Sequence, residues 1–384
     1  MQQRSGITVL KGPIYIEITE FAKNPICTGI QRVEREILQN WCGPNSLVPC
    51  IYHTQRQEFI EVDATSLQSI MEHKSDDESR KTLIGHGMHN ARGIATSTVL
   101  SNLFNPEVFF DPVRAQKYIE WISVKDTRIS WLVYDFMPFL YPEHYPVGTP
   151  LHCMPYLLAM RNIPRLAFIS NQTRCEFDTK IVRKSSRETF VFPLGGDGLR
   201  LEKQSFSQER RSFVYFGTIE PRKNVGAVLR AFMALWERGV SVELFVIGRM
   251  DSRARDEAAL INQLQNEHRF HYLGHASDAA IRDALRKARA TIFVSSQEGF
   301  GIPPLESLAA GIPAIVSSAL PSINDLPKGG CLKIETVSPG AICTAIEFIA
   351  NDANAINMWQ EARDLPIPTW RDFAAGLSNW LHSF

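Results

Sequence analysis

Two glutamates, Glu298 and Glu306, flank two glycines and a proline pair in the stretch SSQEGFGIPPLESLAAG, residues 295–311. The β-rich run that precedes them, ATIFVSS, predicts a strand. Pro303 and Pro304 suit the first turn of a helix, where a missing amide hydrogen costs little. The glutamates therefore lie at a strand-to-helix junction, and open α/β sheets bind their ligands at the carboxyl ends of strands.

The backbone at this junction suits an anion. Uncapped amides and the helix dipole favour negative charge at a helix N-terminus, and Gly299 and Gly301 let N–H groups approach it closely. The carboxylates of Glu298 and Glu306 would repel a phosphate, so their natural partners are hydroxyl groups; a carboxylate can hold a vicinal diol. A phosphate between two such carboxylates describes a sugar nucleotide, with a ribose on one side and a hexose on the other.

The spacing alone fits a second interpretation equally well, in which Glu306 is an ordinary first-turn helix residue and Glu298 a solvated loop residue. The stretch FGTIEPRKN, residues 216–224, favours the sugar nucleotide. Arg222 and Lys223 follow another predicted strand of the same sheet, where a lysine point charge and an arginine fork would neutralise a diphosphate. Taken alone, these two cations fit a solvated turn.

Short β-rich runs alternate with segments of helical period, which predicts parallel sheets wound with helices. Predicted strands of the first half are ITVL (7–10), YIEIT, TLIG (82–85), ISWLVYD, RLAFIS and TFVFPL. Predicted strands of the second half are SFVYFG, SVELFVIG, FHYLG, ATIFVSS and PAIVSS, with helices over 224–239, 254–268 and 278–289 and a short one from Pro303. The five-strand alternation of the second half is typical of a Rossmann-like doubly wound unit.

At 384 residues the chain is long enough for two domains. The polar stretch LEKQSFSQERR, residues 201–211, indicates a linker between them. We expect one Rossmann-like domain over residues 1–198 and a second over 208–367, and an amphipathic helix in the last segment of the sequence. The fold class is thus α/β, with two doubly wound domains.

The composition excludes several classes of function. Lys plus Arg and Asp plus Glu both number 41, so no overall field draws the chain to nucleic acid or to an anionic membrane. The seven cysteines are scattered and never spaced as CxxC, which favours buried thiols in a reducing cytosol over a metal site. No run reaches the roughly 18 apolar residues of a membrane span. We expect a cytoplasmic protein, with peripheral contact at the inner face of the membrane left open.

Together these residues resemble the retaining family-4 glycosyltransferases of the GT-B fold. EGFGIPPLE is similar to the family's E-x7-E motif, and GTIEPRKN, FHYLGHASD and SSQEGFGIPPLESLAAGIPAIVS follow its second-domain pattern in order. In the first half, TGIQRVERE and YDFMPFLYPE resemble bacterial polysaccharide transferases, particularly the mannosyltransferase B-like branch. The likeness covers most of the chain. It implies that the two domains face a cleft and that the C-terminal helix, over 368–384, joins the first domain.

The resemblance implies roles for particular residues. Glu298 would hold hydroxyls of the donor sugar, Glu306 the ribose, and Lys223 the diphosphate. Gly29 would lie beneath the diphosphate, and His275 would line the base pocket. Further donor-binding positions implied in this way are Gly217, Thr218, Gly299, Phe300, Gly301, Ile302 and Leu273.

Three positions depart from the family pattern. Many relatives have arginine at the position of Thr218, so Arg222 would have to supply the second phosphate cation. Relatives often carry His-Asp where this chain has Tyr134 and Asp135. The usual acidic residue after Leu-Pro is Ser322 here.

The implied reaction moves a hexosyl group from a nucleotide diphosphate to an acceptor hydroxyl with retention of the anomeric configuration. A double displacement needs a nucleophilic carboxylate, and the sequence offers no clear one. Catalysis would then be electrostatic, with Lys223 and Arg222 stabilising the leaving diphosphate and Glu298 orienting the sugar. Asp135 is the first-domain candidate, with turn capping as its alternative role; Arg32 and His89 are weaker candidates. No metal and no other cofactor is expected.

The expected partners are a nucleotide-sugar donor and a saccharide or lipid-linked saccharide acceptor in cell-surface polysaccharide synthesis. GDP-mannose is the leading donor, and dTDP-rhamnose or a UDP-sugar stays open. Two other functions fit the same architecture. A sugar-nucleotide 2-epimerase would convert the donor without an acceptor, and a non-catalytic nucleotide-sugar-binding subunit would bind the donor without releasing nucleotide.

Overall fold

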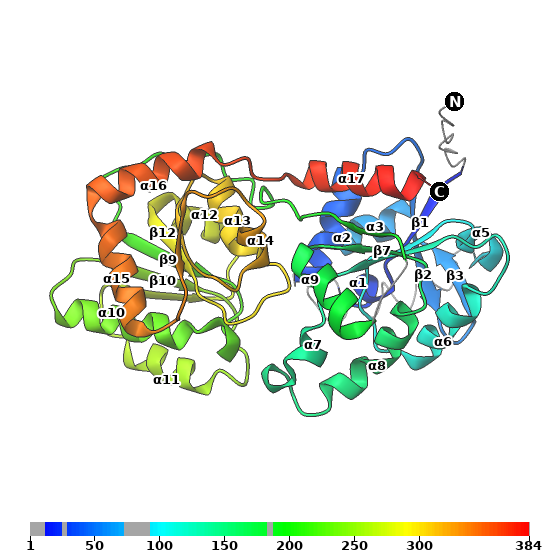
Figure 1. Ribbon diagram of the computed structural model, residues 1–384, viewed down its shortest axis with the longest axis horizontal. Coiled ribbons are helices and arrows are strands. Elements are labelled where there is room, and N and C mark those ends of the chain that lie inside the picture. Colours follow the sequence, from blue (N-terminus) through cyan, green and yellow to red (C-terminus); the bar gives the residue numbers. More distant parts are fainter. Residues whose placement is uncertain (1–11, 25–28, 73–92, 183–186, 384) are drawn as a thin grey trace. The chain divides into compact units, whose positions relative to one another are not determined.

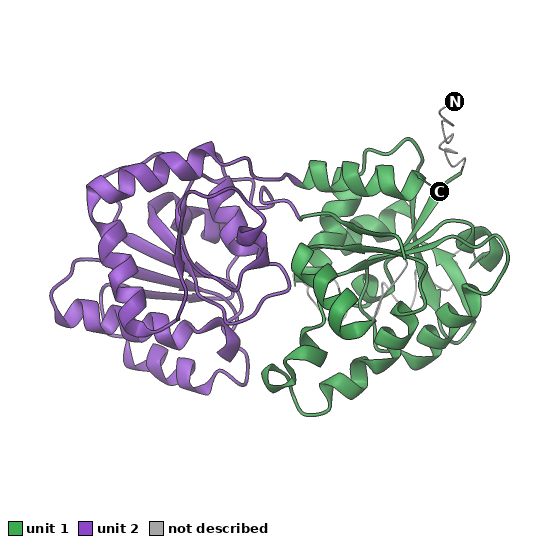
Figure 2. Cartoon of the chain, viewed as in Figure 1, with its two compact units in different colours: residues 1–193, 370–384 green, residues 194–369 purple. Residues whose placement is uncertain are grey.

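The computed structural model describes residues 12–24, 29–72, 93–182 and 187–383. The chain forms two compact units, residues 1–193 with 370–384 and residues 194–369 (Figure 2). It enters the second unit after Pro193 and returns to the first at Trp370. The strands predicted over 7–10 and 82–85 lie outside the described residues.

An eight-stranded sheet forms the centre of the first unit (Figure 1). Its strands are β1 (Ile14–Glu17), β2 (Leu47–His53), β3 (Glu58–Glu61), β4 (Gly93–Ile94), β5 (Leu103–Asn105), β6 (Ile129–Val133), β7 (Arg165–Phe168) and β8 (Thr189–Val191). They lie in the order β4-β3-β2-β1-β5-β6-β7-β8. The pairs β2–β3 and β3–β4 are antiparallel, and the other pairs are parallel. The strand order reverses between β1 and β5.

Helices accompany this sheet, and the C-terminal helix belongs to the same unit. They are α1 (Thr19–Lys23), α2 (Gly29–Asn40), α3 (Ala64–Met71), α5 (Thr96–Leu100), α6 (Pro112–Trp121), α7 (Met137–Leu140), α8 (Thr149–Met160), α9 (Asn171–Glu176) and α17 (Trp370–His382). Helix α17 packs on α2 and buries Phe373 and Leu377. Its C-terminal end is held by Arg165, whose Nη2 donates to the carbonyl oxygens of Trp380 and Ser383 at 2.8 and 2.9 Å.

A buried cluster of charges joins the carboxyl ends of β1 and β5. The guanidinium of Arg114, 1% exposed, lies 2.7 Å from Glu17 Oε1 and 2.6 Å from Glu107 Oε2. Glu107 Oε1 also accepts hydrogen bonds from the amides of Glu20 and Phe21, at 2.6 and 2.9 Å. One arginine therefore fixes two strands and the start of α1 at the point where the strand order reverses.

Glu34 of α2 adds another buried carboxyl to this cluster. It is 1% exposed, and its Oε2 has no hydrogen-bond partner among the described residues. Burial raises the pKa of Glu34 well above its ordinary value, and the carboxylate of Glu107 raises it further, while Arg114 opposes them. The folded state therefore favours the protonated form of Glu34.

Replacing Glu34 by glutamine should stabilise the protein relative to wild type increasingly as the pH rises. A carboxyl with a raised pKa contributes its full stability below the pKa of the unfolded chain, about 4.3, and loses it as the pH climbs towards the folded value. Glutamine does not ionise, so Glu34→Gln escapes this loss. Urea unfolding at pH 5 and pH 8 measures the difference.

Glu120→Gln is the matched control for this prediction. Glu120 lies exposed in α6, and a hydrogen bond from Lys117 lowers its pKa. The stability of Glu120→Gln relative to wild type should therefore fall slightly as the pH rises, opposite to Glu34→Gln. If the unfolding free energy of Glu34→Gln fell relative to wild type between pH 5 and pH 8, the inference that Glu34 is buried in its protonated form would be contradicted.

A six-stranded parallel sheet forms the centre of the second unit (Figure 1). Its strands are β9 (Ser212–Phe216), β10 (Glu243–Ile247), β11 (Phe270–Gly274), β12 (Ala288–Phe293), β13 (Ala314–Ser317) and β14 (Cys331–Ile334). Their order is β11-β10-β9-β12-β13-β14. The chain winds outward from β9 in one direction and from β12 in the other, so the strand order reverses between these two strands. Ligands of doubly wound sheets bind at this reversal.

Helices connect and cover the strands of the second unit. They are α10 (Val225–Glu237), α11 (Arg255–Gln263), α12 (Asp278–Lys287), α13 (Ile302–Ala309), α14 (Pro321–Asn324), α15 (Pro339–Ala350) and α16 (Asp352–Asp364). Helix α10 packs against α11 and α15, whereas α13 packs against α14 and α16. Every residue of β9, β12 and β13 is buried, as expected for central strands of a parallel sheet.

The α/β class and the two Rossmann-like sheets predicted from the sequence are confirmed. Strands β2, β3, β4, β5 and β14 were not predicted. The four residues of β14 show no recognisable period between Gly330 and a polar loop. The polar stretch 201–211 belongs to the second unit. There the amide of Gln204 donates to the carbonyl of Ala310 at 2.7 Å, and Lys203 Nζ donates to the carbonyl of Arg363.

Candidate functional site

The loops that follow β9 and β12 are bonded to each other. The amide of Ser296 donates to the carbonyl of Arg222 at 2.8 Å, and the Arg222 guanidinium donates to the carbonyl of Gln297 at 2.7 Å. Asn224 Nδ2, at the start of α10, donates to the carbonyl of Val294 at 2.8 Å. The reversal of strand order thus brings the two charged sequence motifs into direct contact.

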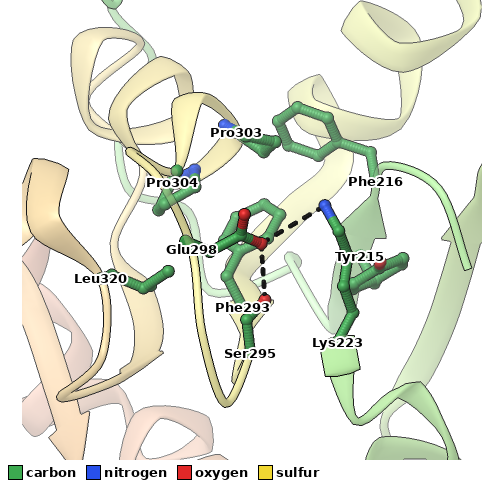
Figure 3. Close-up of a pocket in the computed structure, with 10 residues that line it drawn as sticks. Tyr215, Phe216, Lys223, Phe293, Ser295, Glu298, Pro303, Pro304 and Leu320 are labelled. Atoms are coloured by element: carbon green, nitrogen blue, oxygen red, sulfur yellow. Dashed lines mark hydrogen bonds and ion pairs between the residues drawn. The ribbon is translucent and has the colours of Figure 1, made fainter. Parts of the chain in front are cut away.

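A small pocket opens between these two loops. It is lined by Tyr215, Phe216, Lys223, Phe293, Ser295, Glu298, Gly301, Pro303, Pro304 and Leu320. In Figure 3, Lys223 and Glu298 point towards each other from opposite loops. Lys223 Nζ lies 3.4 Å from Glu298 Oε1, which also accepts a hydrogen bond from Ser295 Oγ at 2.9 Å.

Positive charge dominates the surroundings of Glu298. Arg222 Nη1 lies 2.8 Å from Glu298 Oε2, opposite the oxygen that faces Lys223. Although burial works against ionisation, Lys223 and Arg222 lower the pKa of Glu298 to about 2. Glu298 is therefore a carboxylate at neutral pH, able to accept hydrogen bonds but not to donate a proton.

The N-terminus of α13 faces the same pocket with fewer donors than a typical helix. Gly301, with φ +93°, precedes the helix, and no side chain caps it. Pro303 and Pro304 have no N–H, so the first turn can offer only the amides of Gly301 and Ile302. Ser322 fixes this loop, since its Oγ donates to the Gly301 carbonyl at 2.7 Å. The departure from the family pattern at Ser322 thus has a structural role.

The loops after β9 and β10 touch at two glycines. A Cβ on Gly248 would lie 1.8 Å from the carbonyl oxygen of Gly217, so no other residue fits there without moving that backbone. Gly217 in turn adjoins the pocket, because a Cβ at that position would lie 3.7 Å from Lys223 Nζ. The Tyr215 hydroxyl, which donates to the Thr218 carbonyl at 2.8 Å, holds the same turn.

We expect Gly248→Ala to displace the loop after β9 and to lower both stability and ligand binding at the pocket. An added methyl inside the contact distance of backbone atoms costs typically 1–3 kcal/mol through forced shifts. Gly239→Ala is the control, because Gly239 has φ +75° but open space around its Cβ and so tests backbone strain alone. Equal losses of stability in the two variants would contradict the steric argument.

Glu306 and the proposed base-pocket residues occupy other places in the second unit. Glu306 lies on α13, only 2% exposed, and does not line the pocket around Glu298. Phe300 is also buried, at 5% exposure, and leads into that helix. Leu273 and His275 lie at the end of β11, the edge strand, where Leu273 is 44% exposed.

The remaining candidates belong to the first unit. Gly29 is the first residue of α2, and a Cβ there would meet no atom within 4 Å. Asp135 follows β6, and its Oδ1 accepts a hydrogen bond from the Met137 amide at 3.0 Å, as a turn-capping aspartate does. Arg32 lies in α2. His89 lies outside the described residues.

Sequence reasoning missed Ser295, Glu220 and Arg253. Ser295 binds Glu298, and Glu220 binds Arg222 at 2.6 Å. Arg253 lies 3.6 Å from Glu220 and binds Asp251 at 2.8 Å. The alternation of acidic and basic residues around Pro221 was the available signal for Glu220, whereas nothing in the sequence indicated Arg253.

Within the described ranges, no three or more His, Cys, Asp or Glu side chains gather as a metal site would require. No helix in this part of the chain is long and apolar enough to span a bilayer.

A doubly wound unit with a charged pocket at its strand reversal defines a class of nucleotide-binding proteins. Residues 200–363 match the family described as Glycosyl transferases group 1. The chain has the same fold as HepE of Anabaena in complex with UDP and glucose, with a TM-score of 0.69, 14% identity and coverage of 97% of this chain and 99% of that one. The second unit therefore carries a group 1 glycosyltransferase domain over residues 200–363, and the chain as a whole has the fold of the GT-B structures.

Curated relatives extend the similarity into the first unit. The chain is 24% identical over 370 residues to the serotype-specific mannosyltransferase WbdA of Escherichia coli, which is 90% of this chain and 43% of WbdA. It is 28% identical over 216 residues to a GDP-mannose-dependent α-(1-6)-phosphatidylinositol dimannoside mannosyltransferase of Mycobacterium tuberculosis, covering 53% and 54% of the two chains. The chain thus spans less than half the length of WbdA.

Proposed function

We propose that this protein transfers a hexosyl group from a nucleotide diphosphate sugar to a hydroxyl of a saccharide acceptor, with retention of the anomeric configuration. The observation that carries the proposal is the pairing of Lys223 with Glu298 in the pocket at the strand reversal, 3.4 Å apart. In such a donor the diphosphate and the sugar diol are neighbours, so a cation can bind the first while an adjacent carboxylate binds the second.

Lys223 is the proposed diphosphate ligand. Its ammonium is a compact charge on a flexible stem, so it can turn from Glu298 towards a phosphate oxygen without leaving the pocket. The amides of Gly301 and Ile302, at the N-terminus of α13, would add hydrogen bonds and the positive end of the helix dipole. These groups stabilise the negative charge that builds up on the leaving diphosphate.

Glu298 is the proposed sugar ligand. A carboxylate has roughly four lone-pair directions, and Ser295, Lys223 and Arg222 occupy three of them. At least one direction is left for a sugar hydroxyl, and more become available when Lys223 turns to the phosphate. The hydrogen bonds would orient the hexose without a covalent intermediate.

Mannose from GDP-mannose is the proposed donor group. WbdA is a mannosyltransferase by name, and the mycobacterial relative is described as dependent on GDP-mannose. Leu273 and His275, exposed at the end of β11, are the proposed base-pocket residues, with Gly217 and Thr218 beside the diphosphate. The proposed acceptor is a saccharide, free or lipid-linked, in cell-surface polysaccharide synthesis. In the first unit, Asp135 and Gly29 are the proposed acceptor-side and diphosphate-side positions.

A thermal-shift panel of GDP, UDP and dTDP tests the donor. Ligand that binds only the folded state stabilises it by about 2.7 kcal/mol at 100 times its Kd, so the panel should single out GDP. Release of nucleotide from GDP-mannose should then require an acceptor. Product formed from donor alone would favour an epimerase, and binding without release across a wide acceptor panel would favour a non-catalytic subunit.

Glu306→Gln tests the proposed ribose contact within the same panel. If Glu306 accepts the ribose hydroxyls, glutamine should weaken GDP binding by roughly tenfold, the equivalent of one charged hydrogen bond. The fold should be retained, because glutamine has nearly the same volume. Unchanged GDP affinity would leave Glu306 as a buried helix residue and remove the ribose contact from the proposal.

A further inference from the structure

Arg222 makes more fixed contacts than a mobile phosphate ligand would. Its Nη2 lies 2.6 Å from Glu220 Oε1, and its Nη1 lies 2.8 Å from Glu298 Oε2. The same Nη1 donates to the carbonyl of Gln297 at 2.7 Å. The guanidinium plane is therefore held between the loop after β9 and the loop after β12.

The backbone of Arg222 joins the same two loops. Its carbonyl accepts from the amide of Ser296 at 2.8 Å and from Ser296 Oγ at 3.1 Å. Both ends of the residue thus contact the segment that carries Glu298. A movement of the guanidinium towards a phosphate would break its contacts with Glu220, Glu298 and Gln297 together, while the backbone bonds keep the residue between the two loops.

Charge and burial oppose such a movement. The side chains of Arg222, Glu220 and Glu298 are each only 13–14% exposed. Taking one partner from a buried ion pair leaves an uncompensated charge, which is strongly unfavourable. Among the residues that the structure describes, Lys223 has one ion pair, which is looser at 3.4 Å, so it can move at far lower cost.

We propose that Arg222 is a positioning residue, which holds the Glu298 carboxylate at the angle needed for the donor sugar, and that Lys223 alone of the two cations contacts the diphosphate. Glu220 completes the arrangement by fixing the opposite edge of the guanidinium. This inference rests on the proposed glycosyl transfer and assigns different roles to two neighbouring cations. It replaces the expectation from the sequence that Arg222 supplies the phosphate cation missing at Thr218.

A double-mutant cycle separates positioning from phosphate binding. Glu298→Gln should lower kcat for GDP-mannose by on the order of 10²-fold, and Arg222→Met should do the same. If Arg222 acts through Glu298, the double variant should be no slower than either single variant, because coupled residues are non-additive. A double variant slowed by the product of the two effects would overturn the proposal.

Binding of GDP, which has no sugar, provides the second readout. The Arg222→Met/Glu298→Gln double variant keeps the net charge of the pocket, so its Kd for GDP should stay within about threefold of wild type. Lys223→Ala should raise the same Kd by tenfold or more. A loss of GDP affinity in the double variant as large as that in Lys223→Ala would make Arg222 a phosphate ligand and overturn the inference.

Conservative and control variants complete the experiment. Arg222→Lys should recover part of kcat, since lysine can reach Glu298 but cannot bind Glu220 and Gln297 at the same time. Arg238→Met removes an exposed cation of the same unit that binds Glu347 at 2.9 Å, away from the pocket, and its kcat should stay within about threefold of wild type. A loss in Arg238→Met equal to that in Arg222→Met would mean that general charge, not positioning, matters.

The proposed function can fail separately from this inference. If wild type binds none of GDP, UDP and dTDP, the glycosyl transfer proposal is wrong. The unfolding free energies of the two single variants and the double variant still measure the coupling of Arg222 to Glu298. Additive values in urea unfolding would show that the pair is not coupled and would overturn the positioning role in that case too.

Discussion

Lys223→Ala should lower glycosyl transfer by on the order of 10²–10³-fold while the protein stays folded, as expected for the loss of one preorganised charge at a leaving group. Lys223 Nζ lies in the pocket at the strand reversal, 3.4 Å from Glu298 and beside the turn at Gly217. Without it, the diphosphate loses its proposed cation and faces the Glu298 carboxylate, which Arg222 alone then balances. Both kcat and the affinity for GDP should fall, and initial-rate kinetics with a GDP binding isotherm measure them.

Lys287→Ala is the matched control for this prediction. Lys287 lies exposed in the last turn of α12, in the same unit and with the same charge. Its removal should leave transfer and GDP binding unchanged. If Lys223→Ala transferred sugar at the wild-type rate, the diphosphate assignment of this pocket would be lost.

Arg114→Met should destabilise the first unit by about 3–5 kcal/mol, the usual effect of removing one member of a buried ion pair. The change leaves Glu17 and Glu107, both 0% exposed, without their shared cation. For a unit of this size the melting temperature should drop by roughly 6–20 °C. Urea unfolding followed by tryptophan fluorescence measures the loss, since five of the seven tryptophans belong to this unit.

Arg56→Met provides the comparison for Arg114. Arg56 pairs with Glu58 at 3.5 Å, but both side chains are about 40% exposed, so the pair should contribute no more than about 1 kcal/mol. Equal destabilisation by the two changes would show that the Glu17–Arg114–Glu107 cluster is not a main support of the first sheet.

Several long periodic elements could be predicted from the sequence because hydrophobic period and turn residues report them directly, whereas strand β2 and helices α6, α8, α15 and α16 were not predicted. FHYLG coincides with β11, and the helix predicted over 278–289 is α12 with two residues fewer. The helix predicted over 254–268 ends at Gln263, because Glu267 and Arg269 bond to each other in a turn that a periodicity argument does not register. Short strands such as β5 and β14 have too few residues to show a period.

The candidate site could be predicted in part. Both motifs directly follow predicted strands, which predicted that Lys223 and Glu298 would lie at one edge of a sheet. The two side chains do line one pocket. The binding of Arg222 to both Glu220 and Glu298 depends on side-chain geometry, which spacing does not encode. The near-complete burial of Glu306 likewise depends on how α13 packs against α14 and α16.

The hydrogen bond from the Gly196 amide to the Pro368 carbonyl, 2.9 Å long, sets how this chain could be divided. It joins the two ends of the second unit, so residues 194–369 amount to an insertion whose entry and exit are adjacent. A gene fragment that encodes residues 194–369 should therefore give an independently folding unit. A short loop from Pro193 to Trp370 should suffice to reconnect the first unit once the second is removed.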